Sequence, residues 1–282
     1  MFKKTNLYKL IPNWLKIIFF KIGGKKPWSK GYFTFKFKYI KEAINNQQIM
    51  KKFKNRENLP KKYGYALDER VVEYPWVLSR IAEAPAGHLL DAGSTLNYKQ
   101  IIEFPGLKNK KIVIVNLNPE SYCFWQKEIS YVFADIRELP FRDGYFDYIN
   151  CISTLEHIGM DNTIHTKDQR YKEEKLFDFE KAVLELKRVL KKGGRLFITV
   201  PFGKYQNFRI FQQFDSSRIS RVLEIFEPRE HQIDYYKYTK EGWNISDEAS
   251  CRDCEYFDKK SSLGFDSDFA AASRAVACLE LI

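Results

Sequence analysis

The sequence predicts a doubly wound α/β domain with a mostly parallel sheet and helices on both faces, preceded by a basic, aromatic N-terminal arm. Five short runs rich in β-branched, leucine or aromatic residues recur between residues 87 and 200, separated by helical or loop segments. The first run ends at Asp91 and is followed by Gly93, where a small residue lets the backbone approach a ligand. Basic residues are concentrated in residues 1–62.

The composition limits the classes of protein to which this chain can belong. A chain of 282 residues with 44% hydrophobic content can bury one sizeable core, so we expect one domain with appendages. Its five cysteines are an odd, scattered set, which argues against a disulfide framework and favours a reducing cytoplasm. Cys251 and Cys254 form one CxxC pair without a second pair at ligand spacing, so we expect no metal site.

The charge is distributed unevenly. Residues 1–62 contain 17 Lys or Arg and 2 Asp or Glu, whereas the rest of the chain contains 30 and 34. A polyanion-binding enzyme should carry positive potential around its cleft, so the acidic main domain argues against a nucleic-acid partner.

Within the arm, residues 7–22 are apolar and aromatic, with interspersed lysines and an interruption at Pro12. The segment is shorter than the roughly 20 residues that a membrane span needs, and it lacks the cleavage site of a signal peptide. Two interpretations stay open: a helix lying on an anionic membrane surface, or a helix docked on the main domain or on a partner.

The rest of the arm is less distinctive. Residues 31–40 alternate like a strand, although Phe33, Phe37 and Ile40 also share a helical face, so their state stays open. Residues 47–62 are polar and lysine-rich and predict a linker or exposed turn. We therefore place the domain boundary between residues 62 and 63.

The main domain is predicted element by element. A helix over 68–82 is capped by Asp68 and can bend at Pro75. A helix over 172–190 stops before Gly193, and another begins at Asp215 or Ser216 and reaches residue 226. The predicted strands cover residues 87–91, 111–116, 131–134, 145–150, 195–200 and 275–282.

Five segments occur in a characteristic order: LLDAGS, VNLNPE, FADIRELPF, FDYINCISTLEHIG and RVLKKGGRLFITVP. Together they make the chain resemble the class I S-adenosylmethionine-dependent methyltransferases over roughly residues 65–282. The closest pattern is that of the small-molecule branch, with an EH pair after the fourth strand. The resemblance implies a seven-stranded Rossmann-like sheet whose last strand, 275–282, is antiparallel and neighbours residues 234–238.

The resemblance also implies S-adenosylmethionine as cofactor and assigns residues to it. Asp91 and Gly93 match the turn beneath its methionine part, where the carboxylate holds the ammonium by charge or through water. Asp135 and the backbone of Ile136 match the acceptor for the adenine amino group. Ser153 falls on the wall after the fourth strand.

Two positions depart from the family pattern. Asn116 stands where the family usually has the acidic residue that binds both ribose hydroxyls; an amide can accept from one and donate to the other, and Asn118 is a substitute. The turn after Gly93 lacks the family's second glycine. A non-catalytic interaction protein with a retired cofactor pocket is therefore one alternative.

In methyl transfer the cofactor supplies the leaving group, and the protein aligns the acceptor and excludes water. An oxygen acceptor also needs a base, and the resemblance points to His157, which an ordinary pKa of about 6.5 leaves neutral near pH 7. The alternative is that His157 only hydrogen-bonds structure beneath the pocket. His165 and Asp161 are second choices, and His231 is a third.

The sequence EYPWV, at residues 73–77, is similar to that of methyltransferases of bacterial surface-glycan pathways. This similarity implies O-methylation of a sugar or lipid-linked glycan by a cytoplasmic enzyme, peripheral at the inner face of the membrane. The alternative within the same fold is an RNA or protein methyltransferase whose basic arm holds the substrate.

Overall fold

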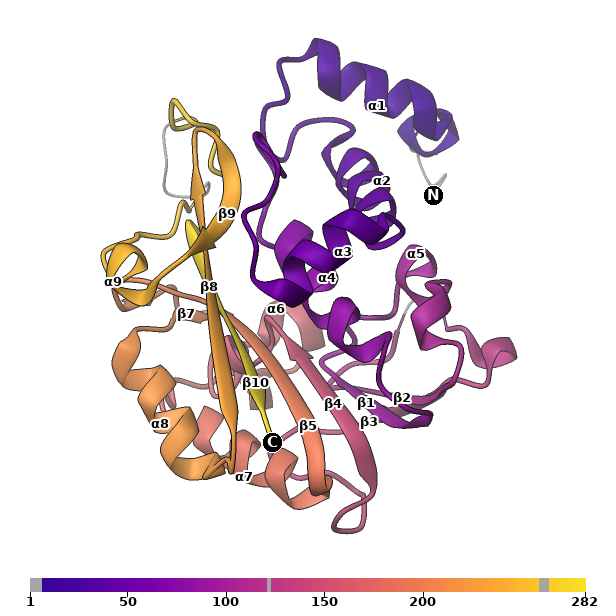
Figure 1. Cartoon of the computed structure of the whole chain (residues 1–282), viewed down its shortest axis with the longest axis vertical. Helices are drawn as coiled ribbons and strands as arrows, with labels where there is room; N and C mark the ends of the chain where they lie inside the picture. The colour runs from indigo at the N-terminus through magenta and orange to yellow at the C-terminus, as the bar shows by residue number, and fades with distance from the viewer. Residues whose placement is uncertain (1–6, 121–122, 259–263) are drawn as a thin grey trace.

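The computed structural model describes residues 7–120, 123–258 and 264–282 (Figure 1). The first six residues of the predicted arm therefore lie outside the described residues. The strands are β1 Gly87–Ala92, β2 Lys110–Asn116, β3 Ser130–Phe133, β4 Phe146–Ile152, β5 Leu190–Pro201, β6 Gln206–Asn207, β7 Gln212–Gln213, β8 His231–Thr239, β9 Gly242–Ser246 and β10 Ala275–Leu281. The helices are α1 Asn13–Ile22, α2 Tyr32–Ile44, α3 Gln47–Asn55, α4 Arg70–Ile81, α5 Lys99–Ile102, α6 Thr163–Thr166, α7 Phe179–Val189, α8 Ser216–Phe226 and α9 Glu248–Cys251. Short 3₁₀ turns lie at Leu7–Leu10, Pro105–Leu107, Trp125–Lys127, Leu155–His157 and Gln169–Tyr171.

The main sheet has the order β3-β2-β1-β4-β5-β10-β8-β9. Strands β1 to β5 are parallel, and β10 runs antiparallel between β5 and β8, as the resemblance implies. The prediction of seven strands is wrong by one, because β9 adds an eighth at the edge. It pairs antiparallel with β8 through a tight turn between Thr239 and Gly242. The short run after this turn carried too little periodicity to be recognised as a strand.

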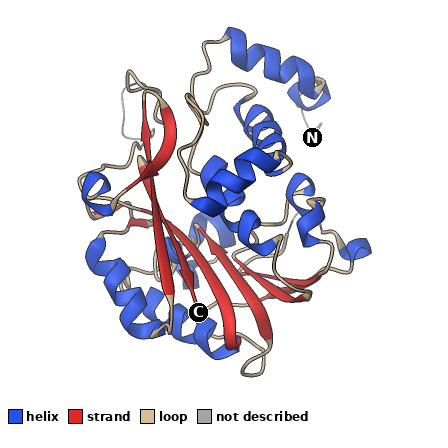
Figure 2. Ribbon diagram, viewed as in Figure 1, coloured by secondary structure: helices blue, strands red, loops and turns tan. Residues whose placement is uncertain are grey.

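Each face of the sheet has its own core (Figure 2). Successive strand residues point to opposite faces, so Leu89 packs with α4 and the N-terminal helices, whereas Leu90 packs with α7 and α8. Burial on both faces explains why the parallel strands are continuously apolar. The layers therefore form the predicted helix–sheet–helix arrangement.

The N-terminal helices α2 and α3 pack against α4 (Figure 1). Residues 31–40, whose state the sequence left open, are helical from residue 32 onward and belong to α2, where Tyr32, Lys36 and Ile40 are buried at helical spacing. The prediction of a linker over residues 47–62 is wrong for its first part, because α3 occupies it. The Asn46 side chain caps this helix, and the fully buried ring of Phe53 anchors it. The domain boundary at residue 62 stays a prediction.

Helix α7 begins at Phe179, seven residues later than predicted, and β5 already starts at Leu190, so Gly193 lies within the strand instead of ending the helix. The reason lies upstream, where Arg137 binds Glu173 at 2.8 Å and Asp178 at 2.6 Å. These ion pairs hold residues 172–178 as a loop against the segment after β3.

The predicted cap of α8 is confirmed. The side chain of Asp215 accepts a hydrogen bond from the amide of Arg218 and caps α8. The cysteines are free thiols. Within the described part of the chain, no helix combines the length and the apolar character that crossing a membrane requires.

Candidate active site

A cavity of about 460 Å³ opens where the parallel strands end. The loops that follow β1, β2, β3 and β4 contribute to it, together with the first turn of α4. In an open α/β sheet this edge is where ligands bind. The predicted site residues that line the cavity are Gly93, Asn116, Ile136, Ser153 and His157.

The turn after β1 forms the floor of the cavity. Gly93 has a φ of +106°, and a Cβ atom there would lie 2.2 Å from the Oγ1 atom of Thr154, so this position requires glycine. The next residue, Ser94, also has a positive φ, and its buried hydroxyl has no hydrogen-bond partner among the described residues. The cavity floor thus offers a close backbone approach and an unused hydroxyl to a ligand.

Asp91 lies beneath this turn. Its Oδ1 accepts hydrogen bonds from Thr95 and Asn150 at 2.9 and 2.8 Å, and its Oδ2 accepts one from the amide of Leu96 at 2.7 Å. Burial raises the pKa of Asp91 to about 6, although these hydrogen bonds lower it. The carboxylate is absent from the described cavity lining; that it holds a ligand's ammonium by charge or through water stays a prediction. We infer that Asp91 acts by shaping the turn.

After β2, an amide and a carboxylate stand together on the wall. The Nδ2 of Asn116 donates to Glu120 Oε1 at 2.8 Å, and its Oδ1 accepts from the amide of Leu117. Both Asn116 and Glu120 line the cavity, as does Asn118. The sequence has no acidic residue directly at the end of β2. Glu120, four residues after Asn116, nevertheless places a carboxylate on the same wall of the cavity. Sequence reasoning overlooked it because it sought the acid at the strand end.

After β3, Ile136 lines the cavity, whereas Asp135 is absent from the described lining. The Asp135 carboxylate accepts hydrogen bonds from the backbone amide and the guanidinium of Arg137, the shortest at 2.7 Å. That this carboxylate also accepts from a ligand's amino group stays a prediction. Asp135 holds Arg137, which in turn anchors the loop before α7.

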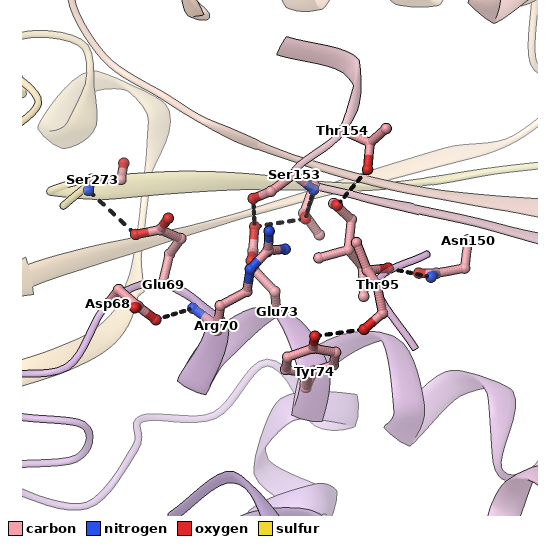
Figure 3. Close-up of polar contacts among 12 residues, drawn as sticks. Asp68, Glu69, Arg70, Glu73, Tyr74, Thr95, Asn150, Ser153, Thr154 and Ser273 are labelled. Carbon is pink, nitrogen blue, oxygen red and sulfur yellow. Dashed lines mark hydrogen bonds and ion pairs between the residues drawn. The ribbon is translucent and has the colours of Figure 1, made fainter. Parts of the chain in front are cut away.

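The first turn of α4 contributes an arginine that the sequence analysis missed (Figure 3). Arg70 lines the cavity, and its guanidinium donates to Oε2 of the fully buried Glu73 at 3.1 Å. The other Glu73 oxygen accepts from the hydroxyls of Ser153 and Thr199 at 2.6 and 2.7 Å. Burial lowers the pKa of Arg70, but Glu73 and neighbouring acidic groups outweigh this effect, so the net shift is upward.

The EYPWV segment, residues 73–77, lies in α4 and makes several of these buried contacts. Glu73 orients Arg70, the Tyr74 hydroxyl donates to the carbonyl of Thr95 at 2.6 Å, and the Trp76 indole donates to Asp234 at 2.7 Å. The segment thus connects the helix to the cavity floor and to β8. The i,i+3 spacing of Arg70 and Glu73 was the one sequence signal that pointed to the arginine.

His157 stands on the wall after β4. Its Nδ1 lies 2.8 Å from the carbonyl oxygen of Ile210. A carbonyl can only accept, so Nδ1 carries the proton and Nε2 keeps its lone pair. Burial lowers the pKa of His157 to about 4, which keeps the ring neutral at physiological pH. The preceding Glu156 is buried, and burial raises its pKa well above the ordinary value.

The other candidate bases differ in their placement. His165 lines the same cavity, and its ring centroid lies 6.1 Å from that of His157. Asp161 accepts from Thr163 and pairs with Arg209 at 3.0 Å. His231 is exposed at the start of β8 and is absent from the described cavity lining, so the structure does not bring it together with the other candidates.

The strand order, the glycine turn and the cavity at the strand ends define a doubly wound, nucleotide-binding type of domain. Residues 92–198 match the protein family described as "Methyltransferase domain". The stretch from the end of β1 into β5 is therefore similar to methyltransferases, in agreement with the resemblance to S-adenosylmethionine-dependent enzymes that the sequence shows. No curated protein matches the chain significantly by sequence.

Solved structures resemble the chain at low sequence identity. A possible histamine N-methyltransferase from Thermotoga maritima is 13% identical over 87% of this chain and 98% of its own, with a TM-score of 0.43. A 1,6-didemethyltoxoflavin-N1-methyltransferase from Burkholderia thailandensis, with bound S-adenosylhomocysteine, is 14% identical over 73% and 74%, with a TM-score of 0.41. A phosphoethanolamine N-methyltransferase from Haemonchus contortus, also with S-adenosylhomocysteine, is 14% identical over 70% and 45%, with a TM-score of 0.40.

Proposed function

We propose that this methyltransferase transfers a methyl group from S-adenosylmethionine to a hydroxyl of a sugar or lipid-linked glycan. One observation carries the proposal: the Gly93 turn and His157 line the same cavity, and Nε2 of this histidine is a proton acceptor. A hydroxyl must lose a proton when it is methylated, and Nε2 of His157 can take that proton. The EYPWV similarity supports a glycan as the acceptor.

The residues present fit the cofactor. The unused hydroxyl of Ser94 and the space above Gly93 suit its methionine part, and Arg70 suits the carboxylate of that part. Glu120 can accept from the ribose hydroxyls beside Asn116. When bound, the cofactor supplies a methyl group on a sulfonium and its own leaving group.

The chain's part in the reaction is then positioning and proton transfer. The bond from His157 Nδ1 to the Ile210 carbonyl fixes the ring, which lines the cavity and keeps the lone pair of Nε2 free to accept a proton. The acceptor proton moves to Nε2 as the new oxygen–methyl bond forms, and it passes to water afterwards. Burial keeps the pKa of His157 low, although the hydrogen bond to the Ile210 carbonyl raises it, so the transient imidazolium gives up its proton readily.

Calorimetric titration with S-adenosylmethionine tests the proposal. We expect micromolar binding to the full chain, and we expect Glu120→Ala to weaken it by about tenfold or more, because hydrogen bonds to a charged group contribute about 1.5–3 kcal/mol. Glu128→Ala, an exposed residue in the same region, is the matched control and should bind like the wild type. Absence of binding to the wild type would favour the retired-pocket alternative.

Arg70 gives a second prediction in the same titration. Arg70→Met should weaken cofactor binding by about tenfold to a hundredfold, because the cofactor carboxylate loses a charged, forked donor. Arg70→Lys should recover only part of the loss, since lysine lacks the fork geometry. Arg142→Met removes an exposed arginine and serves as control. Unchanged affinity in Arg70→Met would exclude a direct contact.

We also propose that the N-terminal arm binds an anionic membrane surface. Four exposed apolar side chains recur every fourth residue and form a stripe along the first helical segments: Leu10, Trp14, Ile18 and Ile22. Ile17 and Phe20, which lie between these positions in α1, are buried. No acidic residue precedes Glu42, so lysines alone flank the stripe. An apolar face bordered by lysines suits a lipid surface better than an RNA.

Sedimentation with lipid vesicles tests this surface. Vesicles that contain phosphatidylglycerol should bind the full chain more tightly than phosphatidylcholine alone, and salt should weaken the binding. A Trp14→Ser, Ile18→Ser double variant should lose at least about tenfold in affinity, because apolar burial is lost. A Phe177→Ser, Leu184→Ser variant removes exposed apolar side chains elsewhere and should bind normally. Equal binding by both variants would contradict the proposal.

A further inference from the structure

A second cavity, of about 770 Å³, lies outside the cofactor site. Half of its lining residues are aromatic, and the lining comes from four separate segments: the link between α1 and α2, helix α6, the turn between β6 and β7, and the residues between α9 and β10. The aromatic lining residues are Trp28, Phe208, Phe211, Tyr256 and Phe257. A cavity of this size and character is typical of small-molecule sites.

Three of these rings form one continuous surface. The centroids of Phe208 and Phe211 lie 4.7 Å apart with nearly parallel planes, and Tyr256 lies 5.2 and 4.9 Å from them. The backbone of Tyr256 is held by a hydrogen bond to Gln206 at 2.9 Å. Trp28 is fixed from the other side, because its indole donates to the carbonyl of Ala271 at 2.6 Å. The surface is therefore built before any ligand arrives.

This cavity shares a wall with the cofactor cavity. Ile210, whose carbonyl holds Nδ1 of His157, lines the second cavity, whereas His157 lines the first. The ring of His157 also lies 5.8 Å from that of Phe211. In α6, the neighbours Ile164 and His165 line the second and the first cavity respectively. A ligand in the second cavity thus lies directly beside the candidate base.

We propose that the second cavity binds an apolar group that the acceptor carries next to the hydroxyl that is methylated. The inference rests on the proposed function and names the acceptor more closely: a glycoside with a hydrocarbon aglycone. Sugar hydroxyls buried without hydrogen-bond partners would be unfavourable, and this lining offers mainly rings and aliphatic side chains. Arg209, at the rim, is already paired with Asp161 at 3.0 Å.

The hydrocarbon can be an aliphatic chain or an aromatic ring, and three probes separate these sources. The full chain is titrated calorimetrically with n-octyl β-glucoside below its micelle concentration, with phenyl β-glucoside, and with glucose. We expect at least one of the two glucosides to bind while glucose does not bind in the same range. Tighter binding of the octyl compound identifies a lipid chain, and tighter binding of the phenyl compound identifies an aromatic aglycone.

Variants assign the binding to this cavity. Phe208→Ala and Phe211→Ala should each weaken the favoured glucoside by about tenfold, since each removes one ring from the contact surface. Both side chains are partly exposed, so the fold should tolerate the changes; Phe211→Leu keeps apolar area and should lose less. Leu184→Ala, which removes an exposed apolar side chain of α7, should bind normally, which excludes general adsorption of the probe to exposed apolar residues.

These binding experiments distinguish failure of the acceptor inference from failure of the proposed function. Glucose binding as tightly as the glucosides, or glucoside binding that neither phenylalanine variant weakens, would overturn the inference. If the cofactor binds but no glucoside does, only the acceptor inference fails. If a glucoside binds in this cavity and the cofactor does not, the proposed function fails while the cavity remains a binding site.

Discussion

Replacing Gly93 with alanine is expected to weaken binding of S-adenosylmethionine by about a hundredfold or more, the largest effect on affinity that we predict. A Cβ atom at this position would lie 2.2 Å from Oγ1 and 2.5 Å from Cγ2 of Thr154, and the φ of +106° is unfavourable for any side chain. The turn must therefore shift, and with it the adjacent hydroxyl of Ser94. Calorimetric titration of the variant measures the loss.

Two further variants show whether the clash or the backbone conformation is responsible. Gly144 also has a positive φ, of +59°, but a Cβ atom there would meet nothing closer than 3.9 Å. Gly144→Ala should therefore cost some stability and leave cofactor affinity unchanged. Adding Thr154→Ala to Gly93→Ala removes the two closest atoms and should restore part of the affinity. Normal affinity in Gly93→Ala alone would mean that the cofactor binds elsewhere.

The second large effect is expected at His157. His157→Ala should lower kcat by about 10²- to 10⁴-fold, the range that general-base catalysis contributes, whereas cofactor affinity should hardly change. His165→Ala, on the same cavity wall, is the matched control and should retain most of the activity. A loss of the same size in both variants would point to a structural role shared by the two rings.

The pH dependence provides an independent check on the same residue. A base acts in its neutral form, so a pKa of about 4 for His157 predicts that kcat/KM falls on the acidic side only near pH 4. An unperturbed histidine would lose activity already below about pH 6.5. The lowered pKa also makes the unfolded state bind the proton more readily, so stability should decline as pH falls from about 6.5 towards 4. His157→Ala should reduce both dependences.

The sequence predicted much of the fold because its strands are distinct and its turns are chemically marked. Parallel strands buried on both faces produce continuous apolar runs, and Asp215 marks the start of α8 by its side-chain chemistry. Helix α3 was missed because its mean hydropathy is low and Phe53 is its single buried residue, so the segment has the composition of a polar linker. The start of α7 was missed because ion pairs from Arg137, distant in sequence, compete with helix formation there.

For the candidate site, too, the sequence predicted some features and missed others. Gly93, Asn116, Ile136, Ser153 and His157 line the cavity as their places after the strands predict, because the ends of neighbouring parallel strands meet at one edge. Position in the chain does not decide where a side chain points. Asp91 and Asp135 stand at the expected positions, yet their carboxylates are used by Thr95 and Arg137.

The sequence by itself therefore determined the class of domain, the strands that bound the cavity and the glycine turn beneath it, since these follow from local periodicity and backbone chemistry. Only the tertiary structure decided which charged groups face the cavity. Arg70 enters it from a helix before β1, and Glu120 from a loop after β2. The aromatic cavity joins Trp28 to Tyr256 from opposite ends of the chain. Such juxtapositions arise from packing between distant segments, which leaves no periodic signal in the sequence.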